Sequence, residues 1–314
     1  MDLILVFPGQ GSQKPGMARD VADAFPAAKR ALEECDAALG SQGARLTSVM
    51  FDGPAEELTL THNAQPALLA HGAALWAALG ESLKPHVRAA AGHSLGESTA
   101  YHAAGALSLA DAIRLVRARG ELMYRTGVEH PGAMAAILGT LTRSIDDVCR
   151  EASAVGRVVP ANYNNDEQVV LSGEVAAVDK AIELAKAAGA KRAMRLNVSG
   201  AFHSPLMEPA VEGLRTALAR PSWKAPQFPV YSNVDAAPNS SADNARDLLL
   251  RQVTAPVRWV DVVRNLARDC PGATFVELGP GNVLTGLIKR IVPGANAMAC
   301  GTVAEIEQLR TKLL

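Results

Sequence analysis

The stretch VRAAAGHSLG, from Val87 to Gly96, predicts a buried strand, a tight turn and the start of a helix. Two glycines allow the sharp backbone turn that lifts the Ser94 hydroxyl clear of the chain. The alanine-rich helix that follows would hold its first N–H groups beside developing negative charge. This pattern is typical of a nucleophile elbow, and a simple glycine turn between strand and helix is the alternative.

Short apolar strands alternate with longer helical patterns around this turn, as is typical of an α/β protein. Ser108 and Asp111 supply a helix start signal just after it. The elements expected before residue 127 are strands 3–7 and 87–91 and helices 17–39, 64–80, 95–104 and 109–126.

The pattern changes between residues 128 and 198, where we expect a small ferredoxin-like subdomain. Its expected β-α-β-β-α-β order is strand 133–138, helix 144–153, strands 157–163 and 168–172, helix 175–188 and strand 191–197. Residues 1–127 and 199–314 would then form a larger α/β catalytic subdomain with a parallel sheet. After a turn at 238–241, the latter segment predicts helices 243–252 and 257–268, strand 274–278 and helices 283–291 and 303–313.

Composition excludes several classes of protein. The chain has 314 residues, 48% hydrophobic, with a net charge of -1, which indicates a folded protein without the basic excess that nucleic acid requires. Four cysteines lie far apart, so no disulfide framework or metal site is predicted. No segment has the roughly 20 apolar residues of a membrane span, and the start lacks a signal peptide, so we expect a cytoplasmic protein.

A serine nucleophile needs a base, and His203 is the most promising of seven histidines. It lies in a loop of small residues, from Val198 to Pro205, that leaves room for a substrate. His71 lies on an apolar helix, where a buried structural histidine is the more common role. The loop from Phe7 to Gln13 follows the first strand and lacks a dinucleotide or nucleotide motif, so we expect no cofactor.

Five motifs together resemble the malonyl-CoA:acyl carrier protein transacylase family in order and spacing, over essentially the whole chain. These motifs are FPGQGSQ (7–13), GHSLGE (92–97), RARG (117–120), GAFHS (200–204) and ELGPG (277–281). The resemblance implies a hydrolase-like large subdomain that carries a ferredoxin-like small one.

The resemblance also implies a mechanism and a set of residues. Ser94 would accept malonyl from malonyl-CoA as an ester, and His203 would act as general base and acid in a ping-pong cycle that ends on the phosphopantetheine thiol of acyl carrier protein. Gln10 and Leu95 match the oxyanion-hole amides, and Arg119 matches the arginine that pairs with the malonyl carboxylate. Gln252 matches the position near which a carbonyl oxygen holds the histidine. It is grouped with Arg119 among the substrate-binding residues. A solvated helix face is the alternative for Arg119.

Three further residues are predicted with less specific support. Phe202 would narrow the acyl pocket and disfavour methylmalonyl, unless it only packs the loop. Lys289 and Arg290 would dock the acidic carrier protein near the mouth of the site, with a solvated helix end as the alternative. We expect a monomer.

Alternatives remain at the level of pathway and reaction. The enzyme could serve fatty-acid synthesis or act in trans for a polyketide synthase, and relatives in malonate decarboxylase also share the family. Ser98 and Thr99 stand where relatives often carry larger or apolar side chains, which leaves the pocket width open. A serine esterase would need a histidine later than His203 and an HGGG-type motif, and a non-enzymatic scaffold would not need Ser94 or His203.

Overall fold

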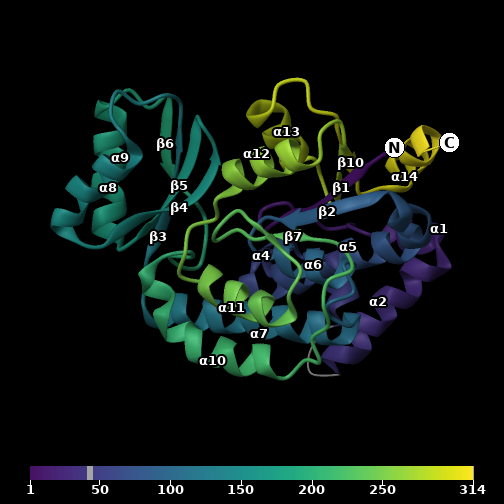
Figure 1. The fold of residues 1–314 in the computed structure, drawn as a ribbon. Helices are drawn as coiled ribbons and strands as arrows, with labels where there is room; N and C mark the ends of the chain where they lie inside the picture. The colour runs from purple at the N-terminus through teal and green to yellow at the C-terminus, as the bar shows by residue number, and fades with distance from the viewer. Residues whose placement is uncertain (41–44, 314) are drawn as a thin grey trace.

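A computed structural model describes residues 1–40 and 45–313 of the chain and contains two sheets. The larger sheet has the order β10-β9-β1-β2-β7-β8 and is parallel except for the β7–β8 pair. Its strands are β1 (Leu3–Phe7), β2 (Val87–Gly92), β7 (Val230–Tyr231), β8 (Pro238–Asn239), β9 (Thr274–Leu278) and β10 (Ala297–Cys300). This sheet and the helices on its faces form the large lobe in Figure 1.

The central strand β1 is buried on both faces, as expected for a parallel strand between two helical layers. Its side chains alternate: Leu5 and Phe7 point to one layer, and Ile4 and Val6 to the other. Phe7 pairs with Gly92 at the carboxyl ends of β1 and β2. This register brings the loop after β1 beside the turn that carries Ser94.

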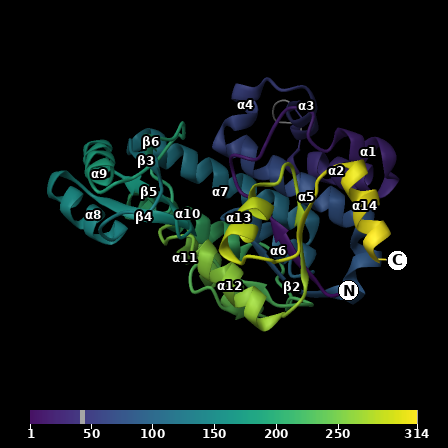
Figure 2. The same cartoon turned by 90° about the horizontal axis from the view of Figure 1, so that it is seen from above.

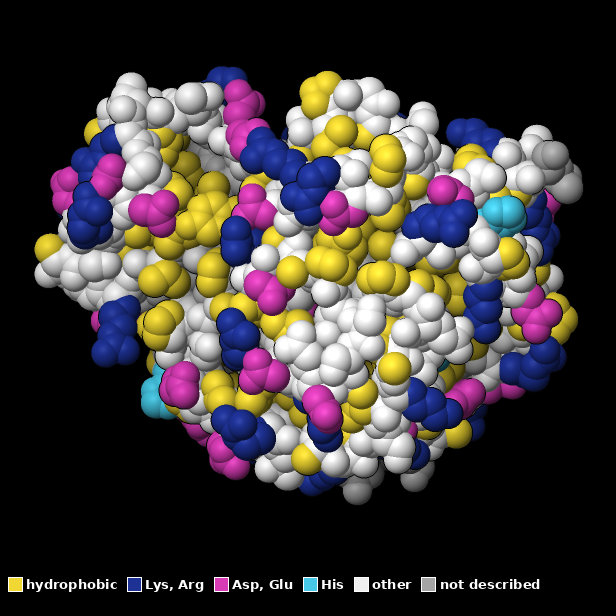
Figure 3. Space-filling view, viewed as in Figure 1, with side chains coloured by type: hydrophobic (Ala, Val, Ile, Leu, Met, Phe, Trp, Pro, Cys, Tyr) yellow, Lys and Arg dark blue, Asp and Glu magenta, His cyan; other side chains and the backbone are white. Residues whose placement is uncertain are grey.

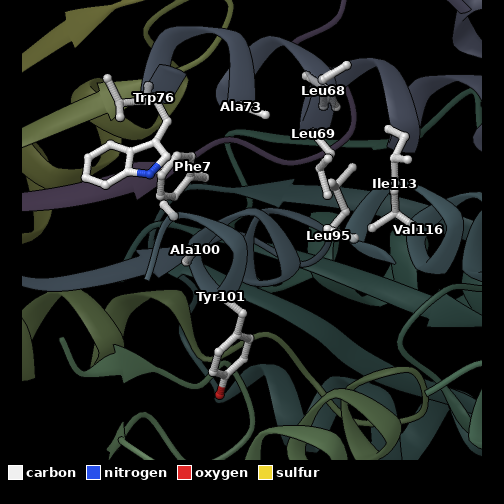
Figure 4. Close-up of a cluster of buried hydrophobic side chains, with 14 of the residues drawn as sticks. Phe7, Leu68, Leu69, Ala73, Trp76, Leu95, Ala100, Tyr101, Ile113 and Val116 are labelled. Carbon is white, nitrogen blue, oxygen red and sulfur yellow. The ribbon is translucent and has the colours of Figure 1, made fainter. Parts of the chain in front are cut away.

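Helices cover both faces of the large sheet. The helices α12 and α13 cover the face of Ile4, and α5, α6 and α7 cover the face of Phe7. Figure 4 shows Phe7, Trp76 of α5 and Tyr101 of α6 among the buried side chains of this second layer. The α-helices of the large lobe are α1 (Arg19–Ala24), α2 (Pro26–Leu39), α3 (Leu46–Asp52), α4 (Ala55–Thr59), α5 (Thr61–Leu83), α6 (Gly96–Ala103), α7 (Leu109–Glu129), α10 (Glu208–Ala219), α11 (Ala242–Gln252), α12 (Trp259–Asp269), α13 (Val283–Ile291) and α14 (Val303–Leu313).

The smaller sheet forms a separate lobe with its own core. Its order β4-β5-β3-β6 is antiparallel throughout, which is the ferredoxin-like arrangement. Its elements are β3 (Ala133–Leu138), α8 (Ile145–Ala152), β4 (Val158–Asn165), β5 (Gln168–Gly173), α9 (Val175–Ala187) and β6 (Arg192–Arg195). Figures 1 and 2 both show this lobe projecting to one side of the large sheet. The predicted subdomain boundaries at 127/128 and 198/199 stay a prediction.

Two contacts join the lobes beside the site. Val257 and β4 exchange backbone hydrogen bonds, from Tyr163 N to Val257 O at 2.9 Å and from Val257 N to Ala161 O at 2.8 Å. His93 and Asn164 are linked between the elbow and β4, with 2.8 Å from Nε2 to Oδ1. Figure 3 shows hydrophobic side chains gathered between the small lobe and the α12 region on the viewed face.

The structure corrects several predicted elements. The helix expected over 17–39 is two helices, because Phe25 precedes Pro26 and adopts an extended conformation (φ -123, ψ 110) that the proline ring favours. The expected turn at 238–241 contains β8, a strand of only 2 residues. The elements α3, α4, β7 and β10 were not predicted. No helix among residues 1–40 and 45–313 has the length and apolarity needed to cross a bilayer.

Candidate active site

A cavity of about 400 Å³ lies between the two lobes at the carboxyl ends of β1 and β2. Ligands of open α/β sheets bind at this edge. The small lobe contributes residues such as Asn162 and Val170 to the lining. Six of the predicted site residues also line it: Gln10, Ser94, Leu95, Arg119, Phe202 and His203.

Ser94 occupies the turn between β2 and α6 in a left-handed conformation, with φ 52. Such a backbone is strained for a residue with a side chain and must be held by its surroundings. Both flanking glycines are required, since a Cβ on Gly92 would lie 1.9 Å from Gly96 C and a Cβ on Gly96 would lie 2.1 Å from Phe7 O. Asn233 also holds the turn, because its Oδ1 accepts from Ser94 N at 2.7 Å and its Nδ2 donates to Gly92 O at 2.8 Å.

His203 is placed to accept the proton of Ser94. Its Nε2 lies 2.7 Å from Ser94 Oγ, and its Nδ1 lies 2.9 Å from Gln252 O and 3.2 Å from Ala255 O. Because carbonyl oxygens only accept, they hold the proton on Nδ1 and leave the Nε2 lone pair facing the serine. Burial, together with the charge of Arg119, lowers the pKa of His203 to about 3, so the imidazole is neutral at pH 7.

Arg119 projects from α7 into the same cavity and is 3% exposed. Its Nη1 donates to Gln65 Oε1 at 2.7 Å, and its Nη2 donates to Gln252 Oε1 at 2.9 Å and to Ser94 Oγ at 3.1 Å. Burial lowers the pKa of Arg119 to about 10, which leaves it charged at neutral pH. None of its hydrogen bonds within the described chain goes to a carboxylate, so the cation is available to an acidic substrate.

Gln252 connects Arg119 and His203 to a buried acid. Its Nε2 donates to Glu97 Oε2 at 2.8 Å, while its side-chain oxygen faces Arg119 and its main-chain oxygen faces His203. Glu97 is fully buried, and burial raises its pKa to about 7 against the opposing effects of Asn233, Gln252 and Arg119. One residue therefore contacts the cation through its side chain and the base through its main chain.

The backbone amides of Gln10 and Leu95 are available at the cavity wall. Both residues line the cavity, and within the described parts of the chain neither N–H donates a hydrogen bond. The amide of Ser94 itself is occupied by Asn233. Unpaired N–H groups at such a cavity can bind an oxyanion, and this role for Gln10 and Leu95 stays a prediction.

The remaining predicted residues divide between the cavity and the outer surface. Phe202 is buried beside His203 and lines the cavity. Lys289 and Arg290 lie in the last turn of α13. Lys289 lines a different surface hollow, with Met1 and Thr274, and not the predicted mouth. Leu287 of the same helix lines the active-site cavity. Residues two positions apart on a helix point to different sides, so Lys289 faces away from that cavity.

The site also contains residues that were not predicted from sequence, among them Gln65, Asn233 and Asn164. Gln65 is a buried polar residue in an apolar helix, which is a signal that could have been noticed. Asn233 follows the two-residue strand β7 and Asn164 lies near the end of β4, and neither carries a comparable signal. Their roles depend on contacts with residues more than 50 positions away.

The assembled groups match the requirements of one reaction class. A serine with a neutral imidazole, free amide donors and a buried cation can accept an acyl group that carries a second, negatively charged end. An arginine can bind that end with two parallel hydrogen bonds. Within the described residues there is no cluster of three or more side chains that could hold a metal ion.

Comparison with known proteins gives concordant matches over the whole chain. A family model described as acyl transferase domain matches residues 4–310. The chain is 44% identical over 294 residues to malonyl CoA-acyl carrier protein transacylase of Escherichia coli strain K12, which covers 94% of each protein. It is 44% identical over 291 residues to the protein of the same name from Bacillus subtilis strain 168, covering 92% of this chain and 90% of the relative.

Solved structures agree with these relatives. An acyl-carrier-protein-S-malonyltransferase from Bartonella henselae superposes with a TM-score of 0.94 at 40% identity, covering 100% of this chain and 99% of the other. A malonyl-transacylase in complex with a type II PKS acyl-carrier protein superposes with a TM-score of 0.93 at 42% identity, covering 99% and 100%. At 40% and 42% identity, the likeness covers the amino-acid sequence as well as the fold.

Proposed function

The chain belongs to the malonyl-CoA:acyl carrier protein transacylase family, and from this we propose that it transfers malonyl from malonyl-CoA to the phosphopantetheine thiol of acyl carrier protein. The protein is therefore an S-malonyltransferase that supplies fatty-acid synthesis. The observation that carries the substrate class is Arg119, a buried cation with neutral partners whose Nη2 is 3.1 Å from the Ser94 hydroxyl.

In the first half-reaction, Ser94 Oγ attacks the thioester carbonyl while its proton passes to His203 Nε2. Support comes from the 2.7 Å separation of these atoms and from the neutral imidazole. The tetrahedral oxyanion would accept hydrogen bonds from the amides of Gln10 and Leu95. The C–S bond then breaks, and the coenzyme A sulfur leaves as a thiol with the proton that His203 returns.

The second half-reaction runs the same steps in the opposite sense. The carrier-protein thiol gives its proton to His203 and attacks the malonyl ester, and Ser94 recovers its proton as the C–O bond breaks. Arg119 would hold the malonyl carboxylate throughout, so the acyl group keeps one orientation while the two thiols exchange. We propose no cofactor, because the thioester substrate supplies the activated acyl group, and a cytoplasmic location, since the four cysteines are free.

The intact mass of the protein after brief incubation with malonyl-CoA tests this function. We expect a gain of one malonyl group in the wild type and none in Ser94→Ala. His203→Ala should fold normally and load about 10²–10⁴-fold more slowly, because it loses only proton transfer. Loading of His203→Ala at the wild-type rate would show that another group is the base, and hydrolysis without transfer to a thiol would favour an esterase.

A polyketide pathway is the second candidate, because one structural relative was solved with a type II PKS acyl-carrier protein. Transfer rates to a fatty-acid carrier protein and to a polyketide carrier protein would separate the two. Docking of the carrier protein through Arg290 stays a prediction, whereas Lys289 lines a different hollow. Charge reversal at Arg290 should raise KM for the carrier protein and leave the coenzyme A half-reaction unchanged.

A further inference from the structure

Glu97 is a fully buried acid beside the site for which the transfer steps have no use. It is the second residue of α6, three positions after Ser94. Its Oε2 accepts from Asn233 N at 2.9 Å and from Gln252 Nε2 at 2.8 Å, whereas its Oε1 has no hydrogen-bond partner within the described residues. A carboxylate with one unpartnered oxygen in the interior is costly, while a protonated carboxyl is much less so.

One amide separates Glu97 from Arg119. Gln252 donates to Glu97 and accepts from Arg119, at 2.8 and 2.9 Å, so the acid and the cation lie on opposite sides of one side chain. The other ionisable groups that act on Glu97 are Asp235 from the loop after β7, which disfavours its charge, and Tyr101 from its own helix. Among the described residues, Arg119 is thus the cation that acts on the charge of Glu97.

The number of charges in the site changes when the substrate binds. In the unloaded site, an ionised Glu97 partly compensates the buried charge of Arg119. A malonyl carboxylate against Arg119 would add a second negative charge to the same buried region. Two carboxylates that share one cation in a region of low dielectric do not both stay ionised without a large energetic cost.

We propose that Glu97 takes up one proton from solvent when a malonyl carboxylate binds Arg119, so that loading of a dicarboxylic acyl group is coupled to a proton and loading of a neutral group is not. The inference rests on the proposed function. Glu97 acts through Gln252 and Arg119 without touching the acyl group, which makes it a positioning residue. Its role is to balance the charge of Arg119 when the site is empty and to give up its own charge when the site is full.

The sign of the pH dependence follows from the ionisation of the free site. With a pKa near 7, Glu97 is protonated below neutrality and already suited to malonyl, so loading there needs no further proton. Above neutrality, Glu97 must take up a proton from solvent for each malonyl that is loaded. The specificity constant kcat/KM for malonyl-CoA should therefore fall with rising pH, by up to about tenfold per pH unit, while that for acetyl-CoA should not.

The experiment measures the ratio of kcat/KM for malonyl-CoA to kcat/KM for acetyl-CoA between roughly pH 6 and pH 8.5. Ionisations of coenzyme A and of His203 affect both substrates and cancel in the ratio. We expect the wild-type ratio to fall by about tenfold or more across this range. In Glu97→Gln, which keeps the size of the side chain and an acceptor oxygen, the ratio should be constant within about twofold.

A matched control is available in Glu277, another fully buried glutamate whose pKa burial raises. Its oxygens accept from the amides of Leu284 and Thr285 and have no contact with Arg119. Glu277→Gln should keep the wild-type slope of the ratio. A flat wild-type ratio, or an unchanged slope in Glu97→Gln, would overturn the proposal.

If Glu97→Gln does not fold, a second measurement, made on the wild type, still tests the proposal. Rapid mixing with malonyl-CoA in weak buffer at about pH 7.5, with a pH indicator, should show uptake of about three-quarters of a proton per malonyl loaded, because roughly a quarter of Glu97 is already protonated at that pH. Acetyl-CoA should show no uptake. Malonyl loading without proton uptake would overturn this inference and leave the proposed function intact. Absence of malonyl loading at every pH would overturn the proposed function, and this inference with it.

Discussion

Arg119 is a charged residue in the protein interior whose hydrogen-bond partners in the described structure are all neutral. Replacing it with alanine should lower the ratio of malonyl to acetyl transfer by at least about tenfold, because a charge-assisted hydrogen bond contributes about 1.5–3 kcal/mol and acetyl has no carboxylate to bind. The ratio of kcat/KM values is the quantity to measure, since damage to α7 would depress both rates.

Arg117 provides the matched control for that substitution. It lies on the same helix but donates to Asn63 Oδ1 and to the carbonyl of His62, outside the cavity. Arg117→Ala should leave the malonyl to acetyl ratio unchanged. If Arg119→Ala also leaves it unchanged while both rates fall, the role of Arg119 is structural.

Phe202 is buried beside His203 at the wall of the cavity. Phe202→Ser should admit the extra methyl of methylmalonyl, and we expect its kcat/KM relative to malonyl to rise by about tenfold, the value of one methylene in an apolar pocket. Competition between the two thioesters measures this ratio directly. A loss of stability with an unchanged ratio would mean that Phe202 only packs the loop.

At the scale of elements, the junction of β1, β2 and α6 tolerates no side chain at Gly96. A Cβ there would lie 2.1 Å from Phe7 O, so Gly96→Ala must push α6 away from β1 and displace Ser94. We expect acyl-enzyme formation to fall by at least about 100-fold, because misplacement of about 1 Å has effects of that size. Intact mass against time of incubation measures the rate.

Gly286 in α13 is the control for this element. An added Cβ there has nothing within 4 Å. Gly286→Ala should keep full activity and gain about 1 kcal/mol in unfolding free energy from helix propensity. Normal loading by Gly96→Ala would show that the elbow can relax around a methyl group.

At the scale of the whole molecule, buried neutral histidines make stability depend on pH. His71 in α5 is buried, its Nε2 lies 2.9 Å from Gly301 O, and burial lowers its pKa to about 4. Since the unfolded chain binds this proton near pH 6.5 and the folded chain does not, folding loses stability as pH falls below about 6.5. Glu97 has the opposite effect, because its raised pKa lets the folded state bind a proton first.

His71→Leu should remove the contribution of one histidine to this dependence. Between about pH 7 and pH 5 we expect its unfolding free energy to fall by about 2 kcal/mol less than that of the wild type. Denaturant unfolding at both pH values measures the difference, and the comparison of slopes is independent of any overall loss of stability. Equal slopes in the two proteins would mean that His71 is protonated in the folded state.

Local patterns in the sequence were sufficient for the α/β order, the elbow at Ser94 and the β-α-β-β-α-β order of the small lobe. Each of these depends on residues a few positions apart, whose backbone preferences and apolar spacing act within one element. The break before Pro26 was missed, although a proline restricts the residue before it and the sequence therefore held the signal. The motifs, taken together, indicated the family and with it Ser94, His203 and Arg119.

Only the tertiary structure determined which neutral groups surround Arg119, that Glu97 stands behind Gln252, and that Lys289 points away from the cavity. Arg119 and Gln252 are 133 positions apart, and Glu97 and Gln252 are 155 apart. Strands of two residues, such as β7, likewise exist only because β2 presents a free edge to pair with. Hydrogen bonds between distant segments depend on how whole elements pack, and no pattern of neighbouring residues encodes that packing.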